Sequence, residues 1–353
     1  MLCFTPMVLK RTTEQERVIE PKVLKDEGAQ LDQTLRPQRI GDYIGQSKIK
    51  GHLLVHIEAA RTRSEPLGHT LLHGPPGLGK TTLAHIVAKE MSAQIRITSG
   101  PVLEKPGDLA SILTNLQEGD VLFIDEVHRL RPVVEEMLYS AMEDCVLDLV
   151  IGKGPTARSM RLQLKPFTLM AATTKPGSMS APLRDRFLHN FKLGFYELPE
   201  MQLIVERSAR ILSLSLESNA ANRIAAASRA TPRIANRLIR SVRDFAQVQK
   251  KPRIDLVSVD ATLASLEIDH EGLDATDRKI LLSLIEHFSG GPVGLGTIAA
   301  MLAEEQDTVE DMYEPFLLQQ GYLDRTPKGR MVTRRAYEKF GKVLPKEMQA
   351  SLL

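Results

Sequence analysis

Along the first half of the chain, apolar residues fall into short runs that alternate with amphipathic stretches. Three of these runs have the pattern of buried strands, at residues 70–73, 121–124 and 167–172, and polar or glycine-rich sequence follows each of them. Strands that alternate with helices are typical of a mainly parallel sheet, in which ligands bind at the carboxyl ends of the strands. The region from about Leu35 to Tyr196 is therefore predicted to be an α/β domain.

A different pattern interrupts this domain between residues 147 and 164. Two segments, 147–151 and 160–164, alternate apolar and polar residues on either side of the turn-rich sequence 152–155. This predicts a β-hairpin inserted into the α/β domain. Two interpretations remain open, since the alternating residues either cover the parent domain or form a protruding contact surface for a partner.

The second half of the chain is helical and then basic. Residues 199–266 show helical periodicity throughout, with Thr231 as a predicted N-cap and Pro232 in the first turn of one helix. Three further helices are predicted at 274–288, 295–303 and 308–320, the last capped by Thr308. A turn with three cations, 325–330, then lies between two short apolar pairs. This order predicts a winged helix.

The chain divides on this basis into four parts. We expect an N-terminal arm at 1–30, an α/β domain at 31–196, a helical domain at 197–267 and a winged-helix domain at 268–353. The composition is globular, with 42% hydrophobic and 25% charged residues, which excludes wholesale disorder. No apolar run approaches the roughly 18 residues that a membrane span needs. Two distant cysteines, Cys3 and Cys145, favour a reducing cytoplasm, and no export signal is recognised at the start.

The strongest chemical signal is the segment 74–81, Gly-Pro-Pro-Gly-Leu-Gly-Lys-Thr. It matches the phosphate-binding loop, with a predicted strand before it and a predicted helix after it. Glycines allow consecutive backbone N–H groups to face phosphate oxygens, and the start of the helix adds its positive end. Lys80 supplies a cation for the β- and γ-phosphates, and the Thr81 hydroxyl is placed to ligate Mg²⁺.

Polar side chains at two other strand ends fit the same chemistry. Asp125 suits the second shell of Mg²⁺, and Glu126 is the candidate to polarise the attacking water. Thr174 either orients that water or only satisfies backbone groups. Arg186 and Arg233 are candidate cations for the charge that develops on the γ-phosphate, although spacing alone does not distinguish this role from a surface ion pair.

Positive charge is concentrated at the C-terminal end. Residues 320–347 carry a net charge of +5, from eight basic and three acidic residues, whereas the whole chain carries +2. Such clustering is what phosphate binding requires, although a solvated basic tail has the same composition. The predicted helix before the wing is acidic, so we expect contacts between the wing and the DNA backbone and little sequence specificity.

Taken together, these motifs resemble the AAA+ ATPase superfamily and, within it, the RuvB family of Holliday-junction branch-migration motors. The resemblance runs from about Leu35 to Gly341 and is carried by segments in one order, namely 35–37, 43–46, 74–82, 99–105, 125–130, 182–187, 231–237, 290–294 and 325–327. It implies that 31–196 is an ATPase domain, 197–267 its lid domain and 268–353 a head domain. It further implies ATP and Mg²⁺ as cofactors and a cytoplasmic homohexamer that acts on duplex and Holliday-junction DNA in recombination, DNA repair and the SOS response. It also implies RuvA as a partner, bound through the hairpin at about 146–165, and RuvC in the resolvase complex.

The resemblance also assigns roles to individual residues. The catalytic set would be Lys80, Asp125, Glu126, Thr174 as first sensor and Arg186 as a finger inserted into the neighbouring subunit's site. The nucleotide would contact Leu35, Arg36, Gly77, Lys80, Thr81, Thr82, Tyr196 and Arg233 of one subunit, with Glu143, Asp144, Cys145 and Arg186 of the next. Thr81 would bind Mg²⁺ directly and Asp125 through water, while Arg325 and Arg330 would contact DNA.

Four positions depart from the family pattern. Leu188 and Ala230 replace glycines, Cys145 replaces an aromatic residue, and Gln306 stands where the family often has a DNA-contacting arginine. None of these changes removes a catalytic group. Two other functions fit parts of this pattern. One is a DNA-binding regulator or loader that uses ATP as a switch, which the hairpin and head-domain motifs disfavour. The other is a small-molecule kinase, for which the sequence lacks an evident acceptor pocket.

Overall fold

The computed structural model describes residues 33–151 and 158–345. The chain separates into two compact units, of which the first ends at Arg36 and the second begins at Pro37. Leu35, in the first unit, is buried. All helices and strands below belong to the second unit, and none of those described is long and apolar enough to cross a membrane.

A five-stranded parallel sheet forms the centre of the ATPase domain, in the order β2-β3-β6-β1-β7. Its strands are β1 (Thr70–His73), β2 (Ile95–Ser99), β3 (Val121–Asp125), β6 (Thr168–Thr173) and β7 (His189–Lys192). The three strands predicted from apolar runs are thus present, each within one residue of its predicted start. Leu71 and Leu72 belong to different apolar clusters because neighbouring side chains of a strand face opposite sides of the sheet.

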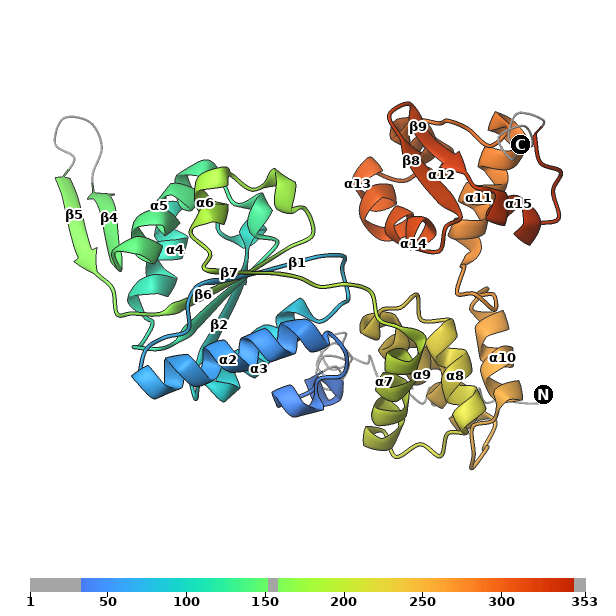
Figure 1. The fold of residues 1–353 in the computed structure, drawn as a ribbon, viewed down its shortest axis with the longest axis horizontal. Helices are drawn as coiled ribbons and strands as arrows, with labels where there is room; N and C mark the ends of the chain where they lie inside the picture. The colour runs from blue at the N-terminus through green and yellow to red at the C-terminus, as the bar shows by residue number, and fades with distance from the viewer. Residues whose placement is uncertain (1–32, 152–157, 346–353) are drawn as a thin grey trace, which may run out of the picture. The chain divides into compact units, whose positions relative to one another are not determined.

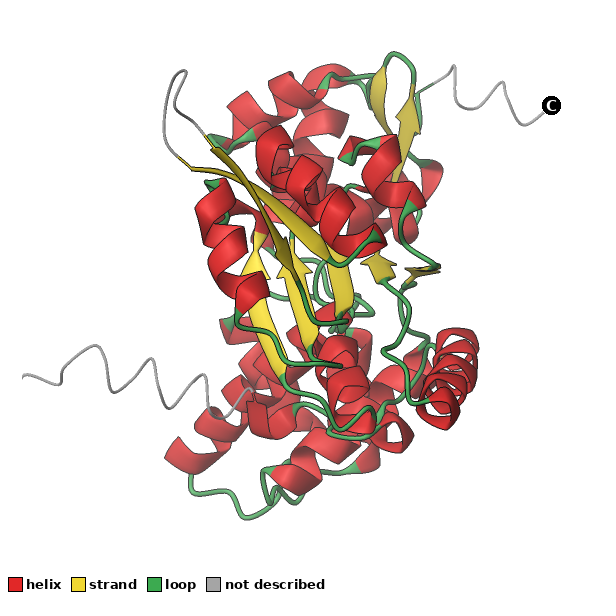
Figure 2. Ribbon diagram, turned by 90° about the vertical axis from the view of Figure 1, so that its left-hand side faces the viewer, coloured by secondary structure: helices red, strands yellow, loops and turns green. Residues whose placement is uncertain are grey.

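Helices cover both faces of this sheet (Figures 1 and 2). On one face α2 (Ser47–Arg63) and α3 (Lys80–Glu90) supply apolar side chains to one cluster. On the other face α4 (Pro106–Thr114) and α5 (Pro132–Glu143) do the same for a second cluster, next to the short α6 (Ala181–Asp185). Short 3₁₀ turns occur at Ile40–Asp42, Gly100–Val102, Val127–Arg129 and Pro176–Ser178.

The predicted hairpin is present as the antiparallel strands β4 (Val146–Ile151) and β5 (Arg158–Gln163), beside α5 in Figure 1. Leu147 is fully buried, and Leu149 and Leu162 pack against the second cluster of the parent domain. Met160 is 44% exposed. The base of the hairpin therefore covers the parent domain, and exposed apolar surface remains farther along it. Residues 152–157, where the turn was predicted, lie outside the described residues.

The lid domain consists of α7 (Leu198–Ile211), α8 (Ser218–Ala226), α9 (Pro232–Val248) and α10 (Leu256–Ser265). Their buried side chains are continuous with the first apolar cluster of the ATPase domain. Helix α9 begins after Thr231 with Pro232 in its first turn, as the sequence predicts. The Thr231 hydroxyl makes no cap bond, however, and instead donates to the carbonyl of Ser228 at 3.2 Å.

The head domain contains α11 (Ala275–Phe288), α12 (Leu295–Leu302), α13 (Gln306–Thr308), α14 (Glu314–Gln319), α15 (Arg334–Lys339) and the antiparallel strands β8 (Leu323–Thr326) and β9 (Gly329–Val332). Thr308 does not cap a helix as predicted, because the helix already begins at Gln306, after Glu305. A π-helix, η6 (Val309–Tyr313), then separates α13 from α14. Pro315 accounts for the wider turn, since it has no N–H to donate and its ring conflicts with the carbonyl one turn earlier.

Candidate functional site

The glycine-rich loop lies between β1 and α3, at the carboxyl edge of the sheet. Gly74, Gly77 and Gly79 all have positive φ, at 138°, 81° and 98°. A Cβ on Gly74 would lie 2.5 Å from the carbonyl oxygen of Leu193, so the backbone packs here at a distance that only glycine permits. The loop is therefore held in a fixed shape by its own sequence.

Two tyrosines hold this loop from outside. The hydroxyls of Tyr43 and Tyr196 lie 3.0 Å apart, and both donate to the carbonyl of Leu78, at 3.2 and 3.1 Å. Burial raises the pKa of Tyr196 to about 12 and that of Tyr43 well above its usual value, so both stay protonated as donors. Tyr196 was predicted at the nucleotide pocket. Tyr43 was not assigned a role, although it lies in one of the segments that carry the resemblance.

Lys80 begins α3 and is buried. Its Nζ donates to the carbonyls of Gly74 and Pro75, at 2.6 and 2.9 Å, inside the curve of the loop. The pKa of Lys80 is lowered to about 8, chiefly by burial and to a smaller extent by Arg233, against the opposing effect of the carboxylates of Asp125 and Glu126. Both predicted acids thus lie close enough to Lys80 to act on its charge. Thr81 and Thr82 follow in the first turn of α3.

The two acids and the predicted sensor end two adjacent strands, β3 and β6. Asp125 accepts a hydrogen bond from the backbone N–H of Glu126 at 3.0 Å. The Thr174 hydroxyl donates to Oε2 of Glu126 at 3.4 Å. His128 Nδ1 lies 3.3 Å from the same oxygen and 2.9 Å from the Thr173 hydroxyl. The structure therefore brings Glu126 and Thr174 together.

His128 is a part of this arrangement to which sequence reasoning gave no role. Burial, the largest influence, lowers its pKa, so the imidazole is neutral at pH 7 and forms no ion pair with Glu126. It connects the ends of β3 and β6 through hydrogen-bonding distances to both. The sequence does contain a feature that points to His128, because this residue lies two positions after Glu126 in the segment 125–130 that carries the resemblance.

Arg233 reaches the loop from the lid domain. Its backbone N–H donates to the carbonyl of Gly77 at 3.4 Å, and a Cβ on Gly77 would lie 3.2 Å from that of Arg233. The lid domain therefore closes one side of the phosphate loop through the first turn of α9. Leu35 and Arg36 belong to the other compact unit, so their place at the nucleotide stays a prediction.

Residues predicted to act on a neighbouring subunit are grouped on α5 and α6. Nη2 of Arg186 lies 3.0 Å from Oε1 of Glu143, whose side chain is half exposed. Asp144 is exposed, and burial raises the pKa of the Cys145 thiol, so that thiol is protonated at pH 7. The structure brings Arg186 and Glu143 into direct contact, and their role toward a neighbour stays a prediction.

The two predicted DNA-contacting arginines differ in their surroundings. Arg330 is buried, and its Nε and Nη2 donate to both oxygens of Glu314, at 3.0 and 2.8 Å. Arg325 is exposed and its Nη2 lies 2.9 Å from Glu310. A DNA contact by Arg330 stays a prediction, and it would require the pair with Glu314 to open. The turn itself consists of Pro327 and Lys328, shorter than predicted because both strands extend further.

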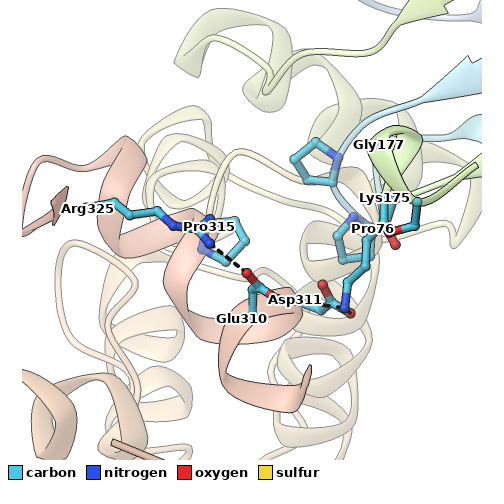
Figure 3. Close-up of a pocket in the computed structure, with 10 residues that line it drawn as sticks. Pro76, Lys175, Gly177, Glu310, Asp311, Pro315 and Arg325 are labelled. Atoms are coloured by element: carbon cyan, nitrogen blue, oxygen red, sulfur yellow. Dashed lines mark hydrogen bonds and ion pairs between the residues drawn. The ribbon is translucent and has the colours of Figure 1, made fainter. Parts of the chain in front are cut away.

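A pocket of about 390 Å³, lined by charged side chains and prolines, lies where the head domain meets the ATPase domain (Figure 3). Lys175, which follows Thr174, forms ion pairs with Asp311 at 3.1 Å and Asp307 at 3.4 Å. On the other side, Arg325 is paired with Glu310 of the same π-helix. The acidic residues of 307–311, predicted to disfavour a groove-reading helix, are thus neutralised from both sides by cations of the protein.

A phosphate loop that follows a parallel strand, an acidic pair on a nearby strand and a helical lid domain that meets the loop define an AAA+ ATPase. Three family descriptions match the chain: the Holliday junction DNA helicase RuvB P-loop domain over residues 35–193, the RuvB AAA lid domain over 196–269 and the RuvB C-terminal winged helix domain over 270–341. The chain belongs to the RuvB family.

Solved structures agree with this assignment. The Thermotoga maritima RuvB Holliday junction branch migration motor is similar at 50% identity and a TM-score of 0.81, covering 88% of this chain and 100% of that one. A single-substitution variant of the same RuvB has 50% identity and a TM-score of 0.82 over the same shares. The predicted fold class, with its α/β ATPase domain, lid domain and winged helix, is confirmed.

Proposed function

We propose that this chain is an ATP-driven motor that forms hexameric rings on duplex DNA and drives branch migration of Holliday junctions. Membership of the RuvB family supports this, and a similar structure is described as that of a branch migration motor. The observation that carries the proposal is the meeting of Lys80, Glu126 and Thr174 at one edge of the sheet, where a triphosphate would lie. For the domain boundaries we propose the limits predicted from the sequence, namely 31–196 for the ATPase domain, 197–267 for the lid domain and 268–353 for the head domain, after an arm at 1–30.

The donors at this edge fit a magnesium-bound nucleotide. Thr81 offers a hydroxyl and Asp125 a carboxylate, both hard oxygen donors of the kind Mg²⁺ prefers. Within 33–151 and 158–345 no group of three or more His, Cys, Asp and Glu side chains could hold a metal ion. An ion here would therefore depend on phosphate oxygens, with Thr81 holding it directly and Asp125 through water. Bound there, it would neutralise charge on the β- and γ-phosphates.

The chain's own residues account for the remaining steps. Lys80 would leave the carbonyls of Gly74 and Pro75 to bind phosphate oxygens, while Gly77, Thr82, Tyr196 and Arg233 shape the pocket. Glu126, placed by Thr174, would orient and polarise the attacking water. Arg186 of the adjacent subunit would supply the last cation, with Glu143, Asp144 and Cys145 beside it. Leu35 and Arg36 would line the nucleotide.

The head domain would bind DNA by contacting the sugar–phosphate backbone of the duplex. Arg325 and Lys328 are exposed at the wing, which supports contacts that do not depend on base sequence. A motor that moves over any sequence needs contacts of this kind. We further propose RuvA as the partner of the hairpin 146–165, RuvC as a partner in the resolvase complex, a cytoplasmic location, and a role in recombination, DNA repair and the SOS response.

Dissociation of a synthetic four-way junction tests this function. The purified chain, with and without RuvA, is expected to separate the junction into two duplexes when ATP is hydrolysed. The Glu126→Gln variant should still bind ATP and DNA but separate nothing, because its side chain cannot act as a base. ATP-dependent DNA binding without junction separation would instead favour a loader or regulator.

A further inference from the structure

A tyrosine lies directly beneath the candidate finger arginine. Cζ of Arg186 is 4.4 Å from the centroid of the Tyr139 ring, within the range of a cation–π interaction. Tyr139 belongs to α5, whereas Arg186 follows the end of α6. The ring of Tyr139 on α5 therefore presents its face to the guanidinium carbon of the arginine that follows α6.

The tyrosine ring is itself fixed at its far end. Its hydroxyl donates to Oε1 of Glu135 at 2.8 Å, and it lies 3.0 Å from Oγ of Ser180. Ser180 also donates to Glu135 and, as the N-cap of α6, accepts from the N–H of Leu183 at 3.2 Å. The hydroxyl of Ser180 thus caps the helix that ends just before Arg186 and also lies within hydrogen-bond distance of the Tyr139 hydroxyl.

The guanidinium is held at few other points. Nη1 donates to the carbonyl of Pro182 at 2.8 Å, and Nη2 pairs with Glu143. Nε is buried without a hydrogen-bond partner among the described residues. Leaving such a donor unpaired is unfavourable, so the arginine's own bonds do not account for its orientation alone, and the groups packed around it contribute. The ring of Tyr139, 4.4 Å from Cζ, is one of these groups.

We propose that Tyr139 is the positioning residue for Arg186. This inference rests on the proposed function, in which Arg186 acts on the nucleotide of the adjacent subunit. An incoming γ-phosphate would compete with Glu143 for Nη2, and that exchange frees one edge of the guanidinium. The ring and the Pro182 carbonyl then keep its plane in place, so that the cation enters the neighbouring site already oriented, which is where catalytic gain from positioning arises.

Single variants give the first test. Tyr139→Leu keeps an apolar side chain of moderate size but removes the π-surface, and it should lower kcat by about tenfold or more with little change in KM. Tyr139→Phe keeps the ring and should lose much less. In the Arg186→Ala background, Tyr139→Leu should cause no further loss, because a residue that acts only through Arg186 has nothing left to position.

Mixed rings separate positioning from a purely structural role. Glu126→Gln inactivates a subunit's own site but leaves its finger intact, whereas Tyr139→Leu impairs only the finger given to the neighbour. An equimolar mixture of the inactive and the impaired variant should reach about a quarter of wild-type ATP turnover, above either variant alone, since each site in a ring is shared by two subunits. A fold defect in Tyr139→Leu subunits would prevent this recovery.

The same variants distinguish the role of Arg186 from that of Tyr139. Normal turnover of Arg186→Ala would overturn the finger assignment in the proposed function. If Arg186→Ala is inactive and recovers activity with Glu126→Gln, but Tyr139→Leu is fully active alone or recovers nothing in the mixture, Tyr139 does not position the finger.

Discussion

Arg330 and Glu314 form a bidentate ion pair inside the head domain, with side chains that are only 11% and 3% exposed. Such a pair is costly to break from one side, because the remaining charge stays buried without a partner. Glu310, 3.8 Å from Arg330, offers partial compensation. The ion pair between Arg330 and Glu314 thus links β9 to the first turn of α14.

The first prediction concerns the stability of this domain. Glu314→Leu should destabilise it by about 3 kcal/mol, whereas the double variant Glu314→Leu/Arg330→Met should recover most of the loss. Calorimetric unfolding of the full chain measures both. An equal loss in the single and double variants would contradict the pair's role.

The double variant also tests the predicted DNA contact, since an unchanged salt dependence of DNA binding would remove Arg330 from the DNA-binding residues.

The second prediction concerns the exposed cation of the wing. Arg325→Ala should weaken duplex binding equally for different sequences and reduce the slope of log K against log salt by about one. Gln306→Arg should increase that slope by about one, because it adds a cation at an exposed position. Fluorescence anisotropy at several salt concentrations measures these slopes. No change in either variant would place the phosphate contacts elsewhere on the head domain.

Local sequence patterns predicted much of this fold. The strand Thr70–His73 and the helix from Lys80 follow from an apolar run, a glycine loop and helical spacing, all of which are short-range signals. The π-helix was not predicted, because helical periodicity alone does not show how Pro315 alters the turn before it. Short-range signals also predicted the phosphate site, because its residues occur in two compact motifs.

Long-range contacts explain what the sequence did not reveal. Tyr43 and Tyr196 meet although 153 positions separate them, and Lys175 pairs with Asp307 across 132 positions. Arg325 and Arg330 look alike in a basic turn, and only the packing of α14 beneath the wing makes one buried and the other exposed. The sequence likewise did not indicate a role for Tyr139, because the α6 segment that it contacts lies about 40 residues further along the chain.

The third prediction concerns the close packing of the phosphate loop. Gly74→Ala should destabilise the ATPase domain by about 1–3 kcal/mol and impair nucleotide binding, because the added Cβ would lie 2.5 Å from a carbonyl oxygen. Gly177→Ala is the matched control, since nothing lies within 4 Å of its added Cβ. Thermal unfolding and fluorescent-nucleotide titration compare the two. Equal behaviour of both variants would show that the loop adapts without strain.

The last prediction concerns the charge of Lys80. Burial sets its pKa at about 8 in the nucleotide-free protein, and a bound phosphate would raise that pKa by favouring the charged form. Between pH 8 and about 9.5 the free protein would therefore have to take up a proton to bind ADP, so affinity should fall by up to about tenfold per pH unit. Below pH 8 Lys80 is already protonated, and the dependence should flatten.

Calorimetric titration with ADP in buffers of different ionisation enthalpy measures this proton uptake directly. Lys80→Arg is the control, because a guanidinium stays charged throughout this range and takes up no proton. The variant is expected to bind more weakly, since the planar group is a poor substitute for an ammonium within the loop, but with an affinity that does not change between pH 8 and 9.5. Equal proton uptake by the wild type and the variant would assign the titration to another group, and the buried ammonium of Lys80 would then be charged before the nucleotide arrives.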